Sequence, residues 1–87
     1  MAVELELQTR VIDVRTPGEY YFQGPGPQGS ELVPLTDLPG RAATWSPEDR
    51  ILVVCDDGRR SRRAVAWLRG HGFRNAQVLE TGAHRTR

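Results

Sequence analysis

The sequence predicts an α/β fold with a small, mainly parallel β-sheet flanked by helices. Three observations carry this prediction. The apolar run at residues 51–54 indicates a buried strand, and a helical pattern follows it from about Ser61. A helix-capping sequence, Thr16–Glu19, directly follows another strand candidate at residues 10–14. Strands that alternate with helices are typical of parallel sheets covered by helices.

The first part of the chain is predicted to hold two strands and a short helix. Residues 2–7 alternate apolar and acidic side chains, which is the period of a half-buried strand. Residues 10–14 are rich in β-branched residues and predict a second strand. Thr16 would then cap a helix over residues 17–22, with a proline at its first position and Glu19 reaching back to the cap.

Glycine and proline residues set the predicted loops and breaks in the middle of the chain. Residues 23–30 contain three glycines and two prolines and predict a loop. Residues 31–35 predict a short strand or extended piece. Thr36 or Asp37 would cap a turn that Pro39–Gly40 is expected to interrupt. Residues 41–45 predict a weak helix.

The last part of the chain predicts a strand, a longer helix and a final strand. After the strand at 51–54, the helix from about Ser61 gathers its apolar residues on one side. Glycines at positions 70 and 72 mark its end, and residues 76–79 predict the last strand.

Length and charge limit the function classes. The 87 residues suffice for one domain, which we expect to span 1–87 with a flexible tail from about residue 83. The formal net charge of +1 gives no reason to expect nucleic acid or an anionic membrane as a partner. No stretch approaches the roughly 18 apolar residues of a membrane-spanning helix, and no signal peptide is expected at the start of the chain.

Cys55 is the single cysteine. It cannot form an internal disulfide, and it excludes a cysteine-based zinc cluster. A lone cysteine without a secretory signal fits a reducing compartment, so the sequence predicts a cytoplasmic protein. No metal or cofactor is predicted.

The same cysteine directly follows the predicted strand at 51–54, in the connection to the following helix. Unpaired N–H groups and the dipole at a helix N-terminus stabilise a thiolate, which is the reactive form of cysteine. Gly58 permits the tight turn that such a site needs, and Arg59 and Arg60 add positive charge. Ligands of open α/β sheets bind at the carboxyl ends of the strands, where this turn would lie. Cys55 is therefore the candidate nucleophile.

Asp56 and Asp57 oppose this activation of Cys55. Carboxylates beside a thiolate raise the pKa of the thiol and repel anionic substrates. We hypothesise that both face solvent and select a cationic or protein-borne acceptor. The alternative for Cys55 is a buried structural cysteine, since free cysteine is among the most buried residue types.

Asp13-x-Arg15 follows the early strand, and Cys55-x-x-Gly58-x-Arg60-Ser61 follows the later one. In order and spacing, these two motifs are the strongest part of a set that resembles a single-domain rhodanese over residues 11–82. Smaller matches are Glu19-Tyr20, Val33-Pro34-Leu35, Gly72-Phe73 and Val78-Leu79.

This resemblance implies a sulfurtransferase. Cys55 would take sulfane sulfur from a donor such as thiosulfate, carry it as a persulfide and pass it to cyanide or a thiol. The loop amides would hold the persulfide, Arg60 would steady the loop or the anionic donor, and Ser61 would cap the helix. The active-site loop would comprise Asp56, Asp57, Gly58, Arg59, Arg60 and Ser61, supported by a structural network that includes Asp13 and Arg15.

The family has a first helix between the opening strand and the Asp-x-Arg strand, and this chain leaves almost no room for it. The family's final helix, expected after Thr81–Gly82, is absent or truncated. The resemblance therefore predicts a rhodanese-like sheet with reduced N- and C-terminal helices.

Two other functions stay open. The first is a non-catalytic rhodanese-fold module that binds a partner or senses sulfur. The second, a phosphatase or arsenate reductase, is disfavoured, because the related phosphatases need a loop one residue longer, with an arginine where this chain has Ser61.

The expected partners are a small sulfur donor and a thiol acceptor, with a sulfur-carrier or thioredoxin-like protein as a further candidate. No membrane partner is expected. The cluster of Arg59, Arg62 and Arg63 is either a solvated helix face or a docking patch for an acidic carrier protein or RNA, and nucleic acid is the less favoured partner.

Overall fold

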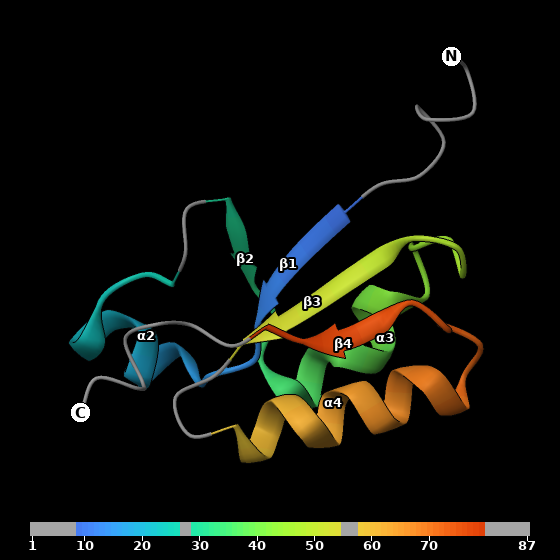
Figure 1. The fold of residues 1–87 in the computed structure, drawn as a ribbon. Coiled ribbons are helices and arrows are strands. Elements are labelled where there is room, and N and C mark those ends of the chain that lie inside the picture. Colours follow the sequence, from blue (N-terminus) through green and yellow to red (C-terminus); the bar gives the residue numbers. More distant parts are fainter. Residues whose placement is uncertain (1–8, 27–28, 55–57, 80–87) are drawn as a thin grey trace.

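The computed structural model describes residues 9–26, 29–54 and 58–79. Four strands form one sheet in the order β2-β1-β3-β4, and all three strand pairs are parallel. Helices connect the strands (Figure 1), so the predicted α/β class with a parallel sheet is confirmed. In chain order the elements are β1 (Thr9–Asp13), α2 (Pro17–Gln23), β2 (Ser30–Leu32), a 3-10 turn η1 (Leu35–Asp37), α3 (Leu38–Ala42), β3 (Arg50–Val54), α4 (Arg59–Gly70) and β4 (Ala76–Val78).

The two central strands bring the ends of distant segments together. Ile12 of β1 lies opposite Val53 of β3, and Asp13 lies opposite Val54. Both strands are rich in β-branched residues, which pack well on a pleated surface that is covered. Because the strands are parallel and end in register, the residues that follow Asp13 and Val54 start at the same edge of the sheet.

The hydrophobic core lies between the sheet and the helices α3 and α4, which lie on the same side of the sheet in Figure 1. Helix α4 packs against β3 and β4. Trp45 and Phe73 meet edge to face, with ring centroids 6.4 Å apart. The fully or almost fully buried apolar residues include Ile12, Leu38, Ile51, Val53, Ala64 and Leu68.

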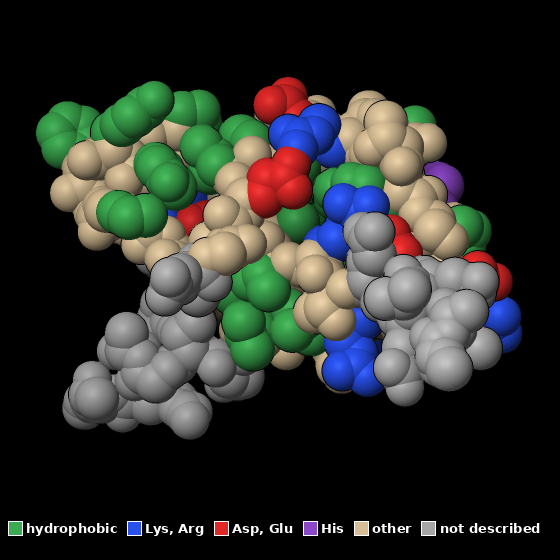
Figure 2. All heavy atoms as spheres, turned by 90° about the horizontal axis from the view of Figure 1, so that it is seen from above, with side chains coloured by type: hydrophobic (Ala, Val, Ile, Leu, Met, Phe, Trp, Pro, Cys, Tyr) green, Lys and Arg blue, Asp and Glu red, His purple; other side chains and the backbone are tan. Residues whose placement is uncertain are grey.

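Helix α2 starts with the predicted capping box. Thr16 Oγ1 accepts a hydrogen bond from the Glu19 amide at 3.2 Å, and Glu19 Oε1 accepts one from the Thr16 amide at 2.9 Å. The helix buries no residue, so capping and its later contacts hold it rather than a core face. Figure 2 shows hydrophobic side chains gathered at the end of the molecule where α2 lies, and Tyr21 and Phe22 are exposed there.

Two predicted boundaries in the middle of the chain were wrong. Helix α3 covers Leu38–Ala42 and contains the Pro39–Gly40 pair, which was expected to interrupt it. Proline has no N–H, and the first turn of a helix needs none there, so Pro39 starts this helix instead of breaking it. The third predicted strand is shorter than expected and begins earlier, at Ser30.

The predicted strand at 2–7, the tail from about residue 83 and the reduced terminal helices lie outside the described residues. Within the described ranges, no helix has the length and apolar character that crossing a membrane requires.

Candidate functional site

The candidate site begins at the carboxyl edge of the sheet, where β1 and β3 end side by side. The Val14 amide donates a hydrogen bond of 3.0 Å to the Val54 carbonyl, which extends the ladder one residue beyond β1. Three residues of sequence then connect Val54 to Gly58. These three are the predicted nucleophile Cys55 with Asp56 and Asp57, and they lie outside the described residues. The structure thus describes the end of β3 at Val54 and the start of α4 at Gly58, on either side of the predicted nucleophile. We call these two flanking segments the frame.

Gly58 precedes the first turn of α4 and has φ of +82° and ψ of −14°. This left-handed conformation carries no steric penalty for glycine but a clear one for residues with a Cβ. A Cβ at this position would also lie 3.2 Å from Nη1 of Arg62. Gly58 therefore sets the sharp turn from the loop into the helix.

Ser61 does not cap the helix, so that prediction was wrong. Helix α4 starts two residues earlier than expected, at Arg59, and its cap residue is Gly58, without a side-chain cap. Ser61 lies inside the first turn and is 1% exposed. Its hydroxyl donates a hydrogen bond of 3.1 Å back to the Gly58 carbonyl. The left-handed glycine allows the helix to begin before the serine is reached.

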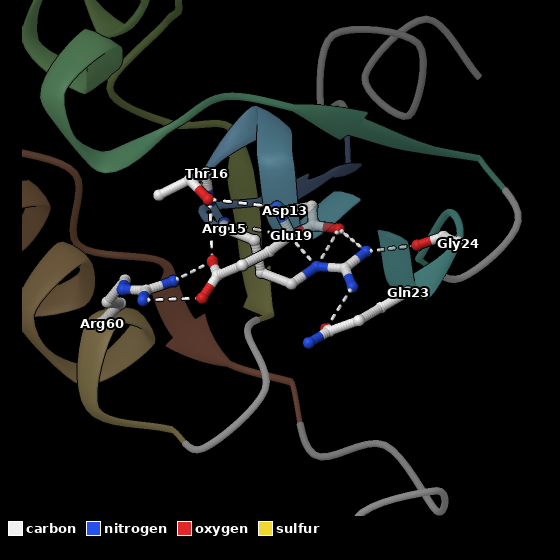
Figure 3. Close-up of polar contacts among 7 residues, drawn as sticks. All are labelled: Asp13, Arg15, Thr16, Glu19, Gln23, Gly24 and Arg60. Atoms are coloured by element: carbon white, nitrogen blue, oxygen red, sulfur yellow. Dashed lines mark hydrogen bonds and ion pairs between the residues drawn. The ribbon is translucent and has the colours of Figure 1, made fainter. Parts of the chain in front are cut away.

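Arg60 forms a two-pronged ion pair with Glu19 of α2 (Figure 3). Its Nη1 lies 2.5 Å from Oε1 and its Nη2 lies 2.9 Å from Oε2. The hydrogen bonds from Arg60, helped by the Thr16 amide, lower the pKa of Glu19 from 4.5 to about 2. Arg60, predicted to steady the loop or the donor, is thus anchored to another element. The sequence identified Glu19 as a capping residue and as part of a smaller family match, and its contact with Arg60 was missed.

A buried ion pair fixes the end of β1. Asp13 is fully buried and Arg15 is 6% exposed. Arg15 Nη2 lies 2.7 Å from Asp13 Oδ2, and its Nε and backbone amide donate to the same carboxylate. Asp13 and Arg15 were predicted to belong to a structural network that supports the loop. The structure shows them buried and hydrogen-bonded to each other, and their support of residues 55–57 stays a prediction.

The same arginine reaches the C-terminal end of α2 (Figure 3). Its Nη2 donates to the Gly24 carbonyl at 2.8 Å, and its Nη1 donates to Oε1 of Gln23 at 3.2 Å. These contacts position α2, and α2 carries the Glu19 that holds Arg60. Helix α2 is therefore held to the end of β1 by Arg15 and to the start of α4 by Glu19.

The frame can support an anionic, nucleophilic site. It provides the N-terminus of a 12-residue helix, whose N–H groups and dipole favour negative charge. The exposed residues Arg59, Arg62 and Arg63 add positive charge on α4. Within the described ranges, no three histidine, aspartate or glutamate side chains cluster in a way that could hold a metal ion.

The sequence profile of the Rhodanese-like domain family matches residues 3–85, almost the whole chain. The chain belongs to the rhodanese-like domain family. The resemblance that the motifs indicated is thereby confirmed. None of the functionally curated proteins matches the sequence significantly.

Solved rhodanese structures share the fold. A rhodanese with anions from E. coli is 28% identical with a TM-score of 0.75, and the match covers 90% of this chain and 92% of that one. A rhodanese-like domain from Anabaena sp. is 27% identical with a TM-score of 0.73, and the match covers 83% and 82%. An NAD-dependent persulfide reductase from A. fulgidus contains a similar segment: 28% identity, a TM-score of 0.65, and 83% of this chain but 13% of that enzyme.

Proposed function

We propose that this rhodanese-like domain is a sulfurtransferase that carries sulfane sulfur as a persulfide on Cys55. The observation that carries the proposal is the frame around residues 55–57: a buried parallel strand ends at Val54, and a left-handed Gly58 opens α4 at Arg59. A cysteine between such a strand end and a helix N-terminus is in a place that favours the thiolate.

The reaction has two steps. The Cys55 thiolate attacks the outer sulfur of thiosulfate, the bond between the two sulfur atoms breaks, and sulfite leaves with the electron pair. An acceptor such as cyanide, or a thiolate, then attacks the terminal sulfur of the persulfide and releases the Cys55 thiolate. The carrier returns to its starting state, so no cofactor is required.

Charge around the frame supports an anionic donor. Arg59 is exposed on the first turn of α4, and Arg62 and Arg63 are exposed further along the same helix. The E. coli relative is described with anions, and the A. fulgidus relative is named for persulfide chemistry. Both descriptions fit a sulfur-transfer role for the domain they share with this chain.

The acceptor that we propose is a thiol, either a small molecule or the cysteine of a sulfur-carrier or thioredoxin-like protein. The exposed Arg59, Arg62 and Arg63 would favour an acidic protein partner. A cysteine that must alternate between thiolate and persulfide needs a reducing compartment, so we propose the cytoplasm as the location.

The test is intact-mass spectrometry of the full chain after incubation with thiosulfate. Wild type should gain about 32 Da, the mass of one sulfur, and lose it on addition of cyanide. Cys55→Ser should gain nothing while keeping the circular dichroism spectrum of the wild type. Thiocyanate formation would then be measured for turnover.

A folded wild-type protein that gains no sulfur from thiosulfate or from a thiol-based persulfide donor would refute the proposal. The family fold would then serve as the non-catalytic binding or sulfur-sensing module, and the acidic pair Asp56–Asp57 beside the cysteine would be the first feature to explain it.

A further inference from the structure

A hollow lies at the end of the sheet opposite the candidate site, and its lining residues come from the starts of β1, β3 and β4 and from the last turn of α4. Figure 1 shows these ends of the elements at the same end of the sheet. Its volume is about 430 Å³. Strand β3 runs from this hollow to the frame of the candidate active site, because its first residue, Arg50, lines the hollow and its last residue is Val54. The hollow is therefore separate from the proposed sulfur-transfer site.

Three arginines from three different segments line this hollow. Arg50 is the first residue of β3, Arg69 lies in the last turn of α4, and Arg74 lies in the turn before β4. Arg69 is oriented by its Nε, which donates a hydrogen bond of 3.0 Å to the Ala76 carbonyl. Arg50 and Arg69 are 19 positions apart in the sequence, and Arg69 and Arg74 are 5 positions apart. The tertiary fold therefore brings their guanidinium groups to one hollow.

Positive charge in the hollow exceeds negative charge. Of the described residues that line it, Glu48 alone is acidic, so within the described part of the chain three arginines and one glutamate leave a formal surplus of two positive charges. Neither Arg50 nor Arg74 forms an ion pair within the described part of the chain. Like charges gathered on a concave surface raise the local concentration of anions.

The chemistry of the lining suits phosphate. A guanidinium group presents a rigid fork of N–H donors that matches two phosphate oxygens. Asn75 and Gln77 add amide groups beside the arginines, and Asn75 is held in place by its Nδ2, which donates to the Glu48 carbonyl at 3.2 Å. The volume lies within the range of roughly 300–1,000 Å³ typical of small-molecule sites.

We propose that this hollow binds a small compound with two or more linked phosphate groups, such as a diphosphate or a nucleoside diphosphate. Two phosphates can engage Arg50 and Arg74, while Arg69, held by its hydrogen bond to Ala76, lines the hollow on the side of α4. Single phosphate would use only part of the surplus charge. This proposal does not depend on the sulfur-transfer activity and stands or falls separately.

The test uses inorganic pyrophosphate as the probe and the full-length chain at low ionic strength. Isothermal titration of the wild type should show saturable binding with one site per chain. The double variant Arg50→Gln/Arg74→Gln should bind at least about tenfold more weakly, because two charge-assisted contacts are lost. The matched control is Arg62→Gln/Arg63→Gln, which removes the same charge from exposed positions in the first half of α4 and should bind pyrophosphate like wild type.

Two outcomes would overturn the proposal. The first is no saturable binding of pyrophosphate to the wild type at millimolar concentration. The second is loss of binding in the control variant together with its retention in the double variant, which would place the anion at the start of α4. Amide shifts in NMR spectra of the unmutated protein decide the same question without any variant: they should cluster at residues 74–77, and a cluster at residues 58–62 would contradict the proposal.

Discussion

Glu19 and Arg60, 41 positions apart in the chain, join the first turns of α2 and α4 through two parallel hydrogen bonds. The same carboxylate accepts the Thr16 amide and closes the cap of α2. One side chain therefore stabilises the start of α2 and anchors Arg60 in the first turn of α4. The position of α2 is linked in this way to the geometry of the candidate site.

Replacing Glu19 with glutamine should separate these two roles. Glutamine can still accept the Thr16 amide as the third residue of a capping box, so α2 should keep its start. The charge that holds Arg60 is lost, and the loop groups should lose part of their alignment. We expect the rate of persulfide formation in Glu19→Gln to fall roughly tenfold, since small misplacements of reacting groups are costly. Stopped reactions analysed by intact mass measure this rate.

The matched control for that variant is Asp37→Asn. Asp37 is an exposed acidic residue at the start of α3 and makes no side-chain cap hydrogen bond there. Its replacement removes the same charge and should leave the rate unchanged. Equal rates in Glu19→Gln and Asp37→Asn would show that the ion pair with Arg60 has no influence on the site.

The lowered pKa of Glu19 predicts a pH dependence of folding stability. The pKa is 4.5 for the ordinary group and about 2 in the folded protein, so the unfolded chain takes up the proton first as the pH falls. The stabilisation by Glu19 is fully present above pH 4.5 and is lost as the pH falls towards 2. Because the pair is partly exposed, salt should weaken the effect.

Urea denaturation of wild type and Glu19→Gln across this pH range measures that dependence. The wild type should be the more stable protein at neutral pH, and the two curves should converge on acidification. A difference that stays constant from neutral pH down to the acid limit would contradict the assignment of the lowered pKa to the contact with Arg60.

Removing Arg15 should destabilise the domain strongly. The variant Arg15→Met keeps a long side chain but leaves the Asp13 carboxylate buried without its charged partner. Breaking a buried pair on one side typically costs about 3–5 kcal/mol, a large share of the roughly 5–15 kcal/mol that stabilises a whole domain. Urea denaturation followed by circular dichroism measures the loss.

The double variant Asp13→Asn/Arg15→Met is the control for this prediction. Asparagine carries no charge but can still accept the backbone amide of residue 15, so the double variant should regain part of the lost stability. A double variant less stable than Arg15→Met would mean that the buried charge is not the source of the cost.

Much of the fold could be predicted from sequence because its strong signals are local. The β-branched runs gave β1 and β3, and the capping box gave the start of α2. Pro39 misled the prediction of α3, because its effect depends on whether it falls in the first helical turn or beyond it. The family resemblance added the Asp13–Arg15 network, which their spacing alone would not have identified.

The contact between Glu19 and Arg60 could not be predicted from periodicity. It joins two helices whose relative position is set by the parallel pairing of β1 with β3 and by the reach of Arg15 to α2. The start of α4 was missed for a related reason: the left-handed Gly58 lets the helix begin at Arg59, while the pattern predicted a helix from about Ser61 and the family resemblance implied Ser61 as its cap. Both features depend on backbone geometry that side-chain patterns do not encode.

Gly58→Ala tests whether this backbone conformation matters for the site. Alanine at φ of +82° costs about 1–2 kcal/mol, and its Cβ would press against Arg62. The turn into α4 would have to change, so we expect lower stability and slower persulfide formation together. Gly70→Ala is the matched control, because Gly70 lies in the last turn of the same helix with nothing within 4 Å of an added Cβ. That variant should be as stable as wild type or more so by up to about 1 kcal/mol. A Gly58→Ala protein with wild-type urea midpoint and wild-type sulfur uptake would show that the left-handed turn is dispensable for the site.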